Sequence, residues 1–185
     1  MTPNGVLERW ERLIMRLFIA INLSPPMKSA LTDAQRAMYD RGVRGNYPPA
    51  ENLHLTLAFI GEYPNADAVM DALSTVSFTP FELTLDGVGR FGGLWWAGLR
   101  ASTALNAVVR RVRRALAEQN IPFDRKRFAP HITLIRKASR DAAGILIQPA
   151  AMTVRTISLL SSRQGRNGMI YTELGVLEAD AASPA

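Results

Sequence analysis

Both histidines of this 185-residue chain lie in the same four-residue pattern, His-x-Thr-Leu. The two copies, 77 residues apart, are His54-Leu55-Thr56-Leu57 and His131-Ile132-Thr133-Leu134. In a β-strand, residues i and i+2 point to the same face, so each copy presents a histidine and a threonine side by side. Core packing gives no reason to choose this pattern twice. The repeat therefore predicts two related strands whose polar faces meet at one shared site.

Two imidazoles and two hydroxyls suit the cleavage of a phosphodiester. One neutral imidazole can take a proton from the attacking oxygen, while the other, protonated, gives a proton to the leaving oxygen. The ordinary histidine pKa of about 6.5 lets both forms coexist near neutral pH. The hydroxyls of Thr56 and Thr133 can donate to the non-bridging phosphate oxygens. This chemistry needs no metal and no cofactor, and we expect none.

Composition narrows the class of protein. The chain has no cysteine, which excludes a disulfide framework, a cysteine nucleophile and a cysteine metal site. That composition fits a reducing cytoplasm, where we expect the protein. The net charge of +6 favours a polyanionic partner, although a merely basic protein would show the same charge. No apolar run reaches the roughly 18 residues of a membrane span, so we expect no membrane partner.

The order of elements predicts an α+β fold with mixed or antiparallel sheets. Expected helices cover residues 24–39, 64–75 and 102–116, the first and third capped by Ser24 and Ser102. Expected strands cover residues 15–23, 53–60, 81–85, 94–99, 131–135, 152–160 and 169–174, the last two joined as a hairpin at Asn167-Gly168. We expect one domain over residues 15–178, between an N-terminal extension (1–14) and a flexible tail (179–185). Met1 and Met15 both remain candidate starts.

A glycine-rich segment matches a nucleotide-binding motif in sequence but not in its context. Residues 87–92 match G-x-G-x-x-G, the dinucleotide-binding fingerprint, but they lead into a strand instead of a helix. We interpret them as a hairpin connection.

The motifs in their context identify a family resemblance. The chain resembles the 2H phosphoesterase superfamily and, more narrowly, the RNA 2′,3′-cyclic phosphodiesterases, also called the 2′-5′ RNA ligase family. The resemblance rests on Arg16 to Ile21, on Glu51 to Glu62 and on Phe128 to Arg136. Ala58 departs from the family pattern, which often has lysine there.

The resemblance implies a bilobal fold with pseudo-two-fold symmetry around a central cleft. It also implies hydrolysis of a terminal 2′,3′-cyclic phosphate on RNA, such as a tRNA fragment, to a 2′-phosphate. In that scheme His54 is the proton donor to the 3′ oxygen and His131 is the proton acceptor for water. The reverse reaction would form a 2′-5′ bond. We expect a monomer. Two alternatives stay open: a non-catalytic RNA-end binder, and an enzyme for small cyclic phosphates.

Further residues are candidates for substrate contact. The resemblance implies Arg136 beside the phosphate, although ideal alternation puts it on the face opposite His131 unless a bulge intervenes. The basic run Arg125, Lys126 and Arg127 could attract an RNA backbone or could simply be solvated. Tyr171 could stack on a base, whereas we expect Phe18 and Phe59 in the core. We expect the arginine face of the third helix in solvent: Arg110, Arg111, Arg113 and Arg114.

Overall fold

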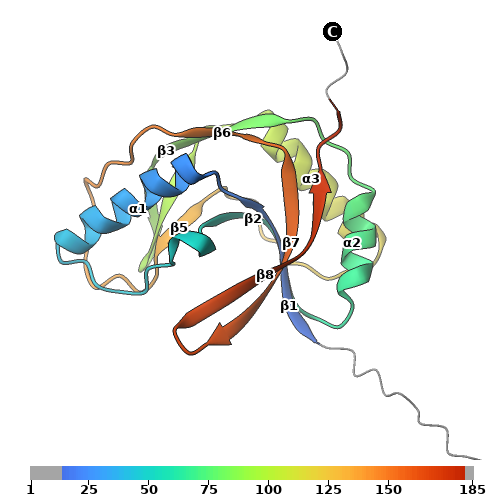
Figure 1. Ribbon diagram of the computed structural model, residues 1–185, viewed down its shortest axis with the longest axis horizontal. Coiled ribbons are helices and arrows are strands. Elements are labelled where there is room, and N and C mark those ends of the chain that lie inside the picture. The colour runs from blue at the N-terminus through green and yellow to red at the C-terminus, as the bar shows by residue number, and fades with distance from the viewer. Residues whose placement is uncertain (1–13, 182–185) are drawn as a thin grey trace, which may run out of the picture.

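The computed structural model describes residues 14–181, which form two four-stranded sheets with the helices on their outer sides (Figure 1). One sheet has the order β2-β1-β7-β8, and the other has the order β5-β4-β3-β6. All paired strands are antiparallel. The strands are β1 (Met15–Asn22), β2 (His54–Tyr63), β3 (Phe81–Phe91), β4 (Leu94–Leu99), β5 (Ile132–Ile135), β6 (Ala151–Val154), β7 (Thr156–Gly165) and β8 (Gly168–Glu178). The helices are α1 (Pro25–Asp40), η1 (Ala50–Asn52), α2 (Ala66–Ser74) and α3 (Thr103–Glu118).

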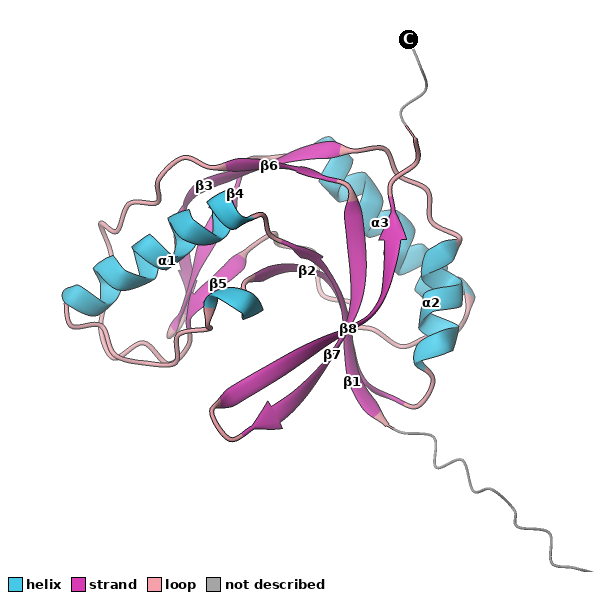
Figure 2. Cartoon of the chain, viewed as in Figure 1, coloured by secondary structure: helices cyan, strands magenta, loops and turns pink. Residues whose placement is uncertain are grey.

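The same strand–helix–strand unit occurs once in each sheet. The first unit is β1-α1-β2, and the second is β4-α3-β5. In both units the second strand returns to the edge of the sheet, beside the first strand, and brings a histidine motif with it. Each helix reaches the opposite sheet in an exchange between the units: α1 packs on β5 and β6, and α3 packs on β2 as well as on β3 of its own sheet (Figure 2). This exchange confirms the expected two-lobed arrangement with pseudo-two-fold symmetry.

The helices bury the residues that their apolar spacing predicts. In α3 the buried face runs from Leu105 through Val112 to Leu116, as periodicity requires. Ser102 caps this helix, since its hydroxyl accepts a hydrogen bond from the Leu105 amide at 3.1 Å. Ser24 occupies the N-cap position of α1, followed by prolines in the first turn as expected, but its hydroxyl makes no capping hydrogen bond. Its hydroxyl is buried without a hydrogen-bond partner among the described residues, and its amide donates to the sulfur of Met152.

Two expected strand boundaries are wrong. Residues 152–160 are not one strand, because the chain leaves one sheet after β6 and enters the other at β7, with Arg155 between them. The glycine-rich segment is mostly strand, because β3 continues to Phe91 and the turn itself is Gly92-Gly93. Gly89 is needed there for space, since the Trp96 ring lies where its side chain would be.

The hairpin of β7 and β8 is confirmed, with its two-residue turn one position earlier than expected, at Arg166-Asn167. The expected extension lies almost wholly outside the described residues, which leave out 1–13. Beyond β8, the amides of Ala179 and Asp180 still donate to backbone carbonyls of the domain. No helix in the described part of the chain is long and apolar enough to cross a bilayer.

Candidate active site

The leucine that ends each motif is an extra residue in its strand. The register between neighbouring strands skips Leu57 in β2 and Leu134 in β5, so each motif contains a bulge at the same place. Both leucines are fully buried. In β5 the extra residue reverses the alternation of the following side chains, and Arg136 therefore lines the same cleft as His131. The bulge that its inward placement requires is present.

Both imidazole rings are oriented by the backbone two residues before them. His54 Nδ1 lies 2.7 Å from the Asn52 carbonyl, and His131 Nδ1 lies 2.7 Å from the Ala129 carbonyl. A carbonyl can only accept, so each Nδ1 carries the proton and donates. In the neutral ring, Nε2 is then free to accept a proton. The two histidines thus share one tautomer and one means of support.

The surroundings of His54 are enclosed. Its ring packs against Phe18 and Tyr171, with centroids 5.0 and 5.3 Å away. Its Nε2 lies 2.9 Å from the Thr56 hydroxyl, which donates to it. Burial lowers the pKa of His54 below its ordinary value of 6.5, and the nearby positive charge of Arg136 lowers this pKa further. The hydrogen bond to Asn52 opposes this shift.

The surroundings of His131 are more open. Its ring meets Phe91 edge-on at 5.5 Å and Trp96 at 6.4 Å. Within residues 14–181 its Nε2 has no hydrogen-bond partner. Thr133 lies half-buried in β5, paired with Trp96 of β4.

A cleft of about 700 Å³ joins the two motifs. It is lined by Thr56 from the first motif, by His131 from the second, and by Arg136. A second hollow of about 420 Å³ is also lined by Arg136, with Asn52 and Tyr171 in its wall. The larger cleft has one acidic side chain in its lining, Asp124, against these basic ones: Arg16, Arg113, Lys126, Arg127 and Arg136.

The remaining predicted residues divide between the cleft and other surfaces. Lys126 and Arg127 line the cleft, whereas Arg125 stacks on Phe123 at 4.9 Å. The expectation for Phe59 is wrong: its side chain is 36% exposed in the cleft wall, beneath the guanidinium of Arg16 at 4.9 Å. Phe18 is buried, as expected.

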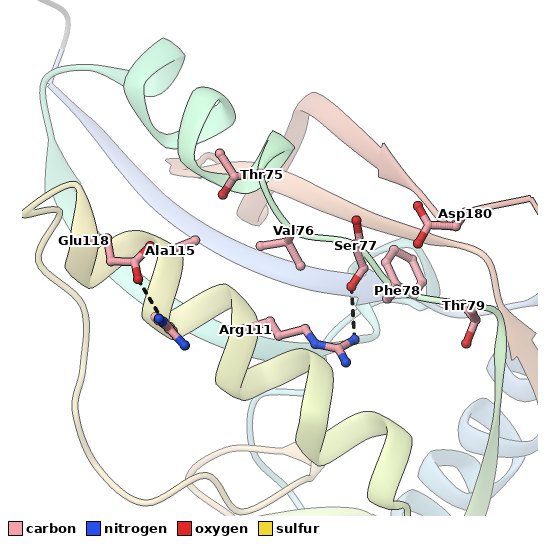
Figure 3. Close-up of a pocket in the computed structure, with 10 residues that line it drawn as sticks. Thr75, Val76, Ser77, Phe78, Thr79, Arg111, Ala115, Glu118 and Asp180 are labelled. Carbon is pink, nitrogen blue, oxygen red and sulfur yellow. Dashed lines mark hydrogen bonds and ion pairs between the residues drawn. The ribbon is translucent and has the colours of Figure 1, made fainter.

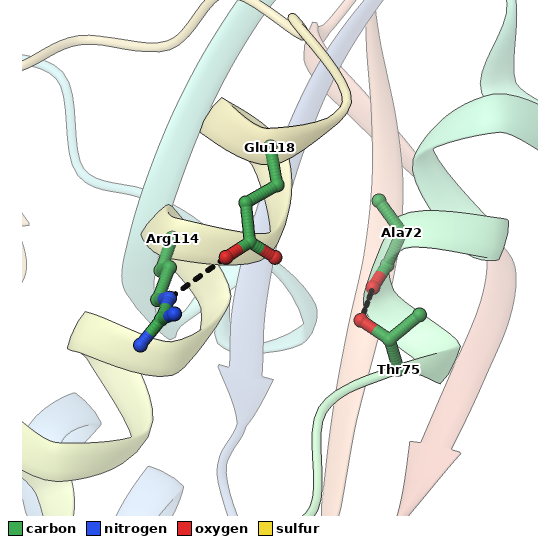
Figure 4. A network of polar contacts seen from close by, with 4 residues as sticks. All are labelled: Ala72, Thr75, Arg114 and Glu118. Carbon is green, nitrogen blue, oxygen red and sulfur yellow. Dashed lines mark hydrogen bonds and ion pairs between the residues drawn. The ribbon is translucent and has the colours of Figure 1, made fainter.

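The arginine face of α3 is not simply solvated. Arg113 donates to two backbone carbonyls and lines the cleft. Arg111 donates to the Ser77 carbonyl at 3.1 Å in a hollow of about 610 Å³ between α2 and α3, which contains neither motif (Figure 3). Arg114 pairs with Glu118 at 2.8 Å on the exposed side of the helix (Figure 4).

Sequence reasoning missed several site residues. Asn52 is buried, and its amide donates to the Met169 carbonyl at 2.8 Å, which fixes the carbonyl that orients His54. Phe91 and Trp96 pack on His131. The signal that could have found them is the glycine-rich segment, which leaves room for the Trp96 ring. The described residues contain no group of three or more His, Cys, Asp or Glu side chains placed to hold a metal ion.

Comparison with known proteins agrees with this geometry. Residues 25–166 match the 2′-5′ RNA ligase superfamily. The chain is 33% identical over 180 residues to an RNA 2′,3′-cyclic phosphodiesterase of Thermus thermophilus, an alignment that covers 86% of this chain and 88% of that protein. It is 32% identical over 157 residues to the protein of that name from Geobacillus stearothermophilus, covering 76% of this chain and 49% of that protein. The chain therefore spans about half the length of the Geobacillus relative.

Solved structures give the same result. E. coli LigT in its apo form is 28% identical, with a TM-score of 0.77 over 90% of this chain and 98% of that one. The same protein complexed with 3′-AMP gives a TM-score of 0.75. The chain belongs to the 2′-5′ RNA ligase superfamily and, within it, to the RNA 2′,3′-cyclic phosphodiesterases.

Proposed function

We propose that this protein hydrolyses the terminal 2′,3′-cyclic phosphate of RNA to a 2′-phosphate by paired acid–base catalysis, without a metal ion. The observation that carries the proposal is the repeated support of the two rings. Each imidazole is held by a carbonyl at 2.7 Å in the same tautomer, and the two motifs meet at one basic cleft. Packing alone would not require the same carbonyl support at both rings, nor a histidine motif at both sides of a cleft lined mainly by basic side chains.

The proposed reaction is a single in-line displacement at phosphorus. Water attacks the phosphorus and gives its proton to His131 Nε2, the bond from phosphorus to the 3′ oxygen breaks, and His54 Nε2 protonates that oxygen. The product is a 2′-phosphomonoester with a free 3′-hydroxyl. Thr56, Thr133 and Arg136 supply donors for the charge that builds on the non-bridging oxygens. Run backwards with a 5′-hydroxyl in place of water, the same groups would form a 2′-5′ bond.

The lowered pKa of His54 bears on the assignment of roles. In the free protein His54 is neutral at pH 7, so it must gain a proton before it can act as the donor. An anionic cyclic phosphate beside the ring would raise the pKa of His54 and so favour the protonated ring that the donor role needs. The second candidate is the exchanged assignment, with His54 as the base and His131 as the acid. The lowered pKa of His54 in the free protein favours this assignment.

The charge of the cleft favours a strand over a mononucleotide. Thr56, His131 and Arg136 suffice for the cyclic phosphate, which leaves Lys126 and Arg127 for upstream phosphates. The guanidinium of Arg16 on the Phe59 ring adds a flat surface on which a base can stack. We propose that the substrate is the end of an RNA strand, such as a tRNA fragment, and that the protein acts as a monomer in the cytoplasm.

Turnover in EDTA of an oligonucleotide with a 2′,3′-cyclic end tests the proposal. The expected result is full activity with a 2′-phosphate product. Strict metal dependence, or a 3′-phosphate product, would overturn the mechanism. Tight binding without turnover would identify an RNA-end binder, and preference for a cyclic mononucleotide would identify an enzyme for small cyclic phosphates.

A further inference from the structure

Each of the two long helices carries one polar side chain that contacts both motif regions. Gln35 of α1 is buried, and its Nε2 donates to the carbonyls of Pro48 and Leu134 at 2.9 and 3.0 Å. Arg113 of α3 donates through Nη1 to the Lys126 carbonyl at 2.8 Å and through Nε to the Leu57 carbonyl at 3.3 Å.

These two sets of contacts follow the pseudo-symmetry of the chain. Gln35 lies 11 residues after Ser24, and Arg113 lies 11 residues after Ser102, the residues that precede the two helices. Each helix has 16 residues. The two side chains therefore occupy equivalent positions in the two units, although their types differ and no sequence pattern connects them.

The acceptors are equivalent as well. One acceptor of each side chain lies in the loop that precedes the motif of its own unit, Pro48 for Gln35 and Lys126 for Arg113. The other is the bulged leucine of the opposite motif. The extra residue of a bulge is left unpaired in the ladder, so a buried carbonyl there needs another donor.

We propose that Gln35 and Arg113 are reciprocal positioning residues that hold the two histidine motifs at their working separation. Each side chain connects the loop that orients one histidine to the strand that carries the other. Arg113 fixes the loop whose Ala129 carbonyl orients His131, and it anchors this loop to β2 beside Thr56. Gln35 does the same for the loop leading to His54 and for β5.

The consequence for catalysis is geometric. Acid and base must both reach one phosphorus, and a misplacement of about 1 Å between reacting groups costs on the order of a hundredfold in rate. The guanidinium of Arg113 lies 6.0 and 5.7 Å from the ring centroids of Phe123 and Phe128. Methionine is also a long, unbranched side chain, so at position 113 it fills much of the same space and removes the donors. The same substitution at Gln35 removes its amide donor.

The experiment compares Arg113→Met with Arg114→Met, its exposed neighbour on α3, and Gln35→Met with Arg36→Met, its exposed neighbour on α1. The substrate is a 2′,3′-cyclic mononucleotide, and this assay rests on the proposed function. We expect kcat to fall about tenfold in Arg113→Met and in Gln35→Met and to stay within twofold in the controls. In the double variant, kcat should fall by a larger factor than the product of the two single-variant factors, because either side chain alone still connects the two units.

Arg113→Lys separates positioning from simple electrostatics. Lysine keeps the charge in the cleft but not the planar, two-armed donor, so it should restore KM while kcat stays low. Full recovery of kcat with lysine would assign Arg113 to charge alone and overturn the proposal. Equal kcat in Arg113→Met and Arg114→Met would also overturn it, as would a loss that vanishes after correction for the folded fraction measured by circular dichroism.

Hydrogen exchange provides a measurement that does not depend on turnover. In Arg113→Met, exchange should accelerate in the segments 124–131 and 54–60 together, and Arg114→Met should change neither. Unchanged exchange in both segments would overturn the positioning role even if the enzyme is active. If the wild type shows no turnover while Arg113→Met still accelerates exchange in both segments, the proposed function is rejected and the positioning role of Arg113 stands.

Discussion

The first and second histidine motifs have the same backbone support and different neighbours. In both, Nδ1 donates to the carbonyl two residues earlier and a bulge follows the threonine. His54, however, packs against two aromatic rings and has the Thr56 hydroxyl on its Nε2, whereas the His131 hydrogen bond is exposed to solvent. The shared support sets where each proton is transferred, and the enclosed surroundings of His54 lower its pKa. A repeated strand can therefore hold two imidazoles in the same way and still place them in different surroundings.

The largest effect expected is the loss of either imidazole. His54→Ala and His131→Ala should each lower kcat at least about a hundredfold, because each removes a proton-transfer group from the step. Steady-state kinetics on a 2′,3′-cyclic substrate, with the fold checked by circular dichroism, measures both. Near-normal turnover in one variant would remove that histidine from the mechanism and end the equivalence of the motifs.

The next effect separates the two threonines. Thr56→Val and Thr133→Val should each lower kcat about tenfold, since each removes one donor to the phosphate oxygens. Thr56→Val should in addition change the pH dependence set by His54, because the hydroxyl that is hydrogen-bonded to its Nε2 is lost. The pH dependence of kcat/KM, which reports the free enzyme, should therefore move in Thr56→Val and stay fixed in Thr133→Val. Matching pH profiles in the two variants would show that this hydrogen bond does not distinguish the motifs.

How far the sequence predicts this site depends on the range of the interaction involved. Strand parity is a local property, and by itself it places His54 beside Thr56 and His131 beside Thr133. Strand parity alone cannot place Arg136, because the direction of its side chain depends on a bulge that is set by pairing with β4. Arg113 is harder still to predict. Its helical spacing indicates a solvated residue, and its contact with β2 depends on how α3 packs on the other sheet.

The glycine-rich segment does belong to a hairpin, as expected, but the strand boundaries predicted there and for residues 152–160 are wrong for one shared reason. Alternation within a segment indicates a strand, but it cannot show that a strand continues through a glycine-rich stretch or that the chain passes from one sheet to another at Arg155. Gly89 is explained by the ring of Trp96, which belongs to the next strand. These are tertiary contacts, and a single sequence contains no local signal for them.

A smaller effect tests the assignment of acid and base. Histidine NMR should show His54 titrating below 6.5 in the free protein, because burial disfavours its charged form. Inorganic phosphate in the cleft should raise this pKa, as the donor role requires. If phosphate leaves the pKa of His54 low, the ring stays neutral in the complex, and the exchanged roles are the correct ones.

The smallest effect concerns stability. Because the folded pKa of His54 lies below its unfolded value of 6.5, the unfolded chain binds the proton more readily, and the free energy of unfolding should decrease as pH falls below about 6.5. Above that pH both states are neutral at this position, and the contribution is constant. His54→Gln should make the dependence shallower, and His131→Gln, at the more exposed ring, serves as the matched control. Urea unfolding at a series of pH values measures the three slopes. Equal slopes in the wild type and in His54→Gln would show that burial does not set the proton affinity of this ring, and the contrast between the two motifs would then rest on Thr56 alone.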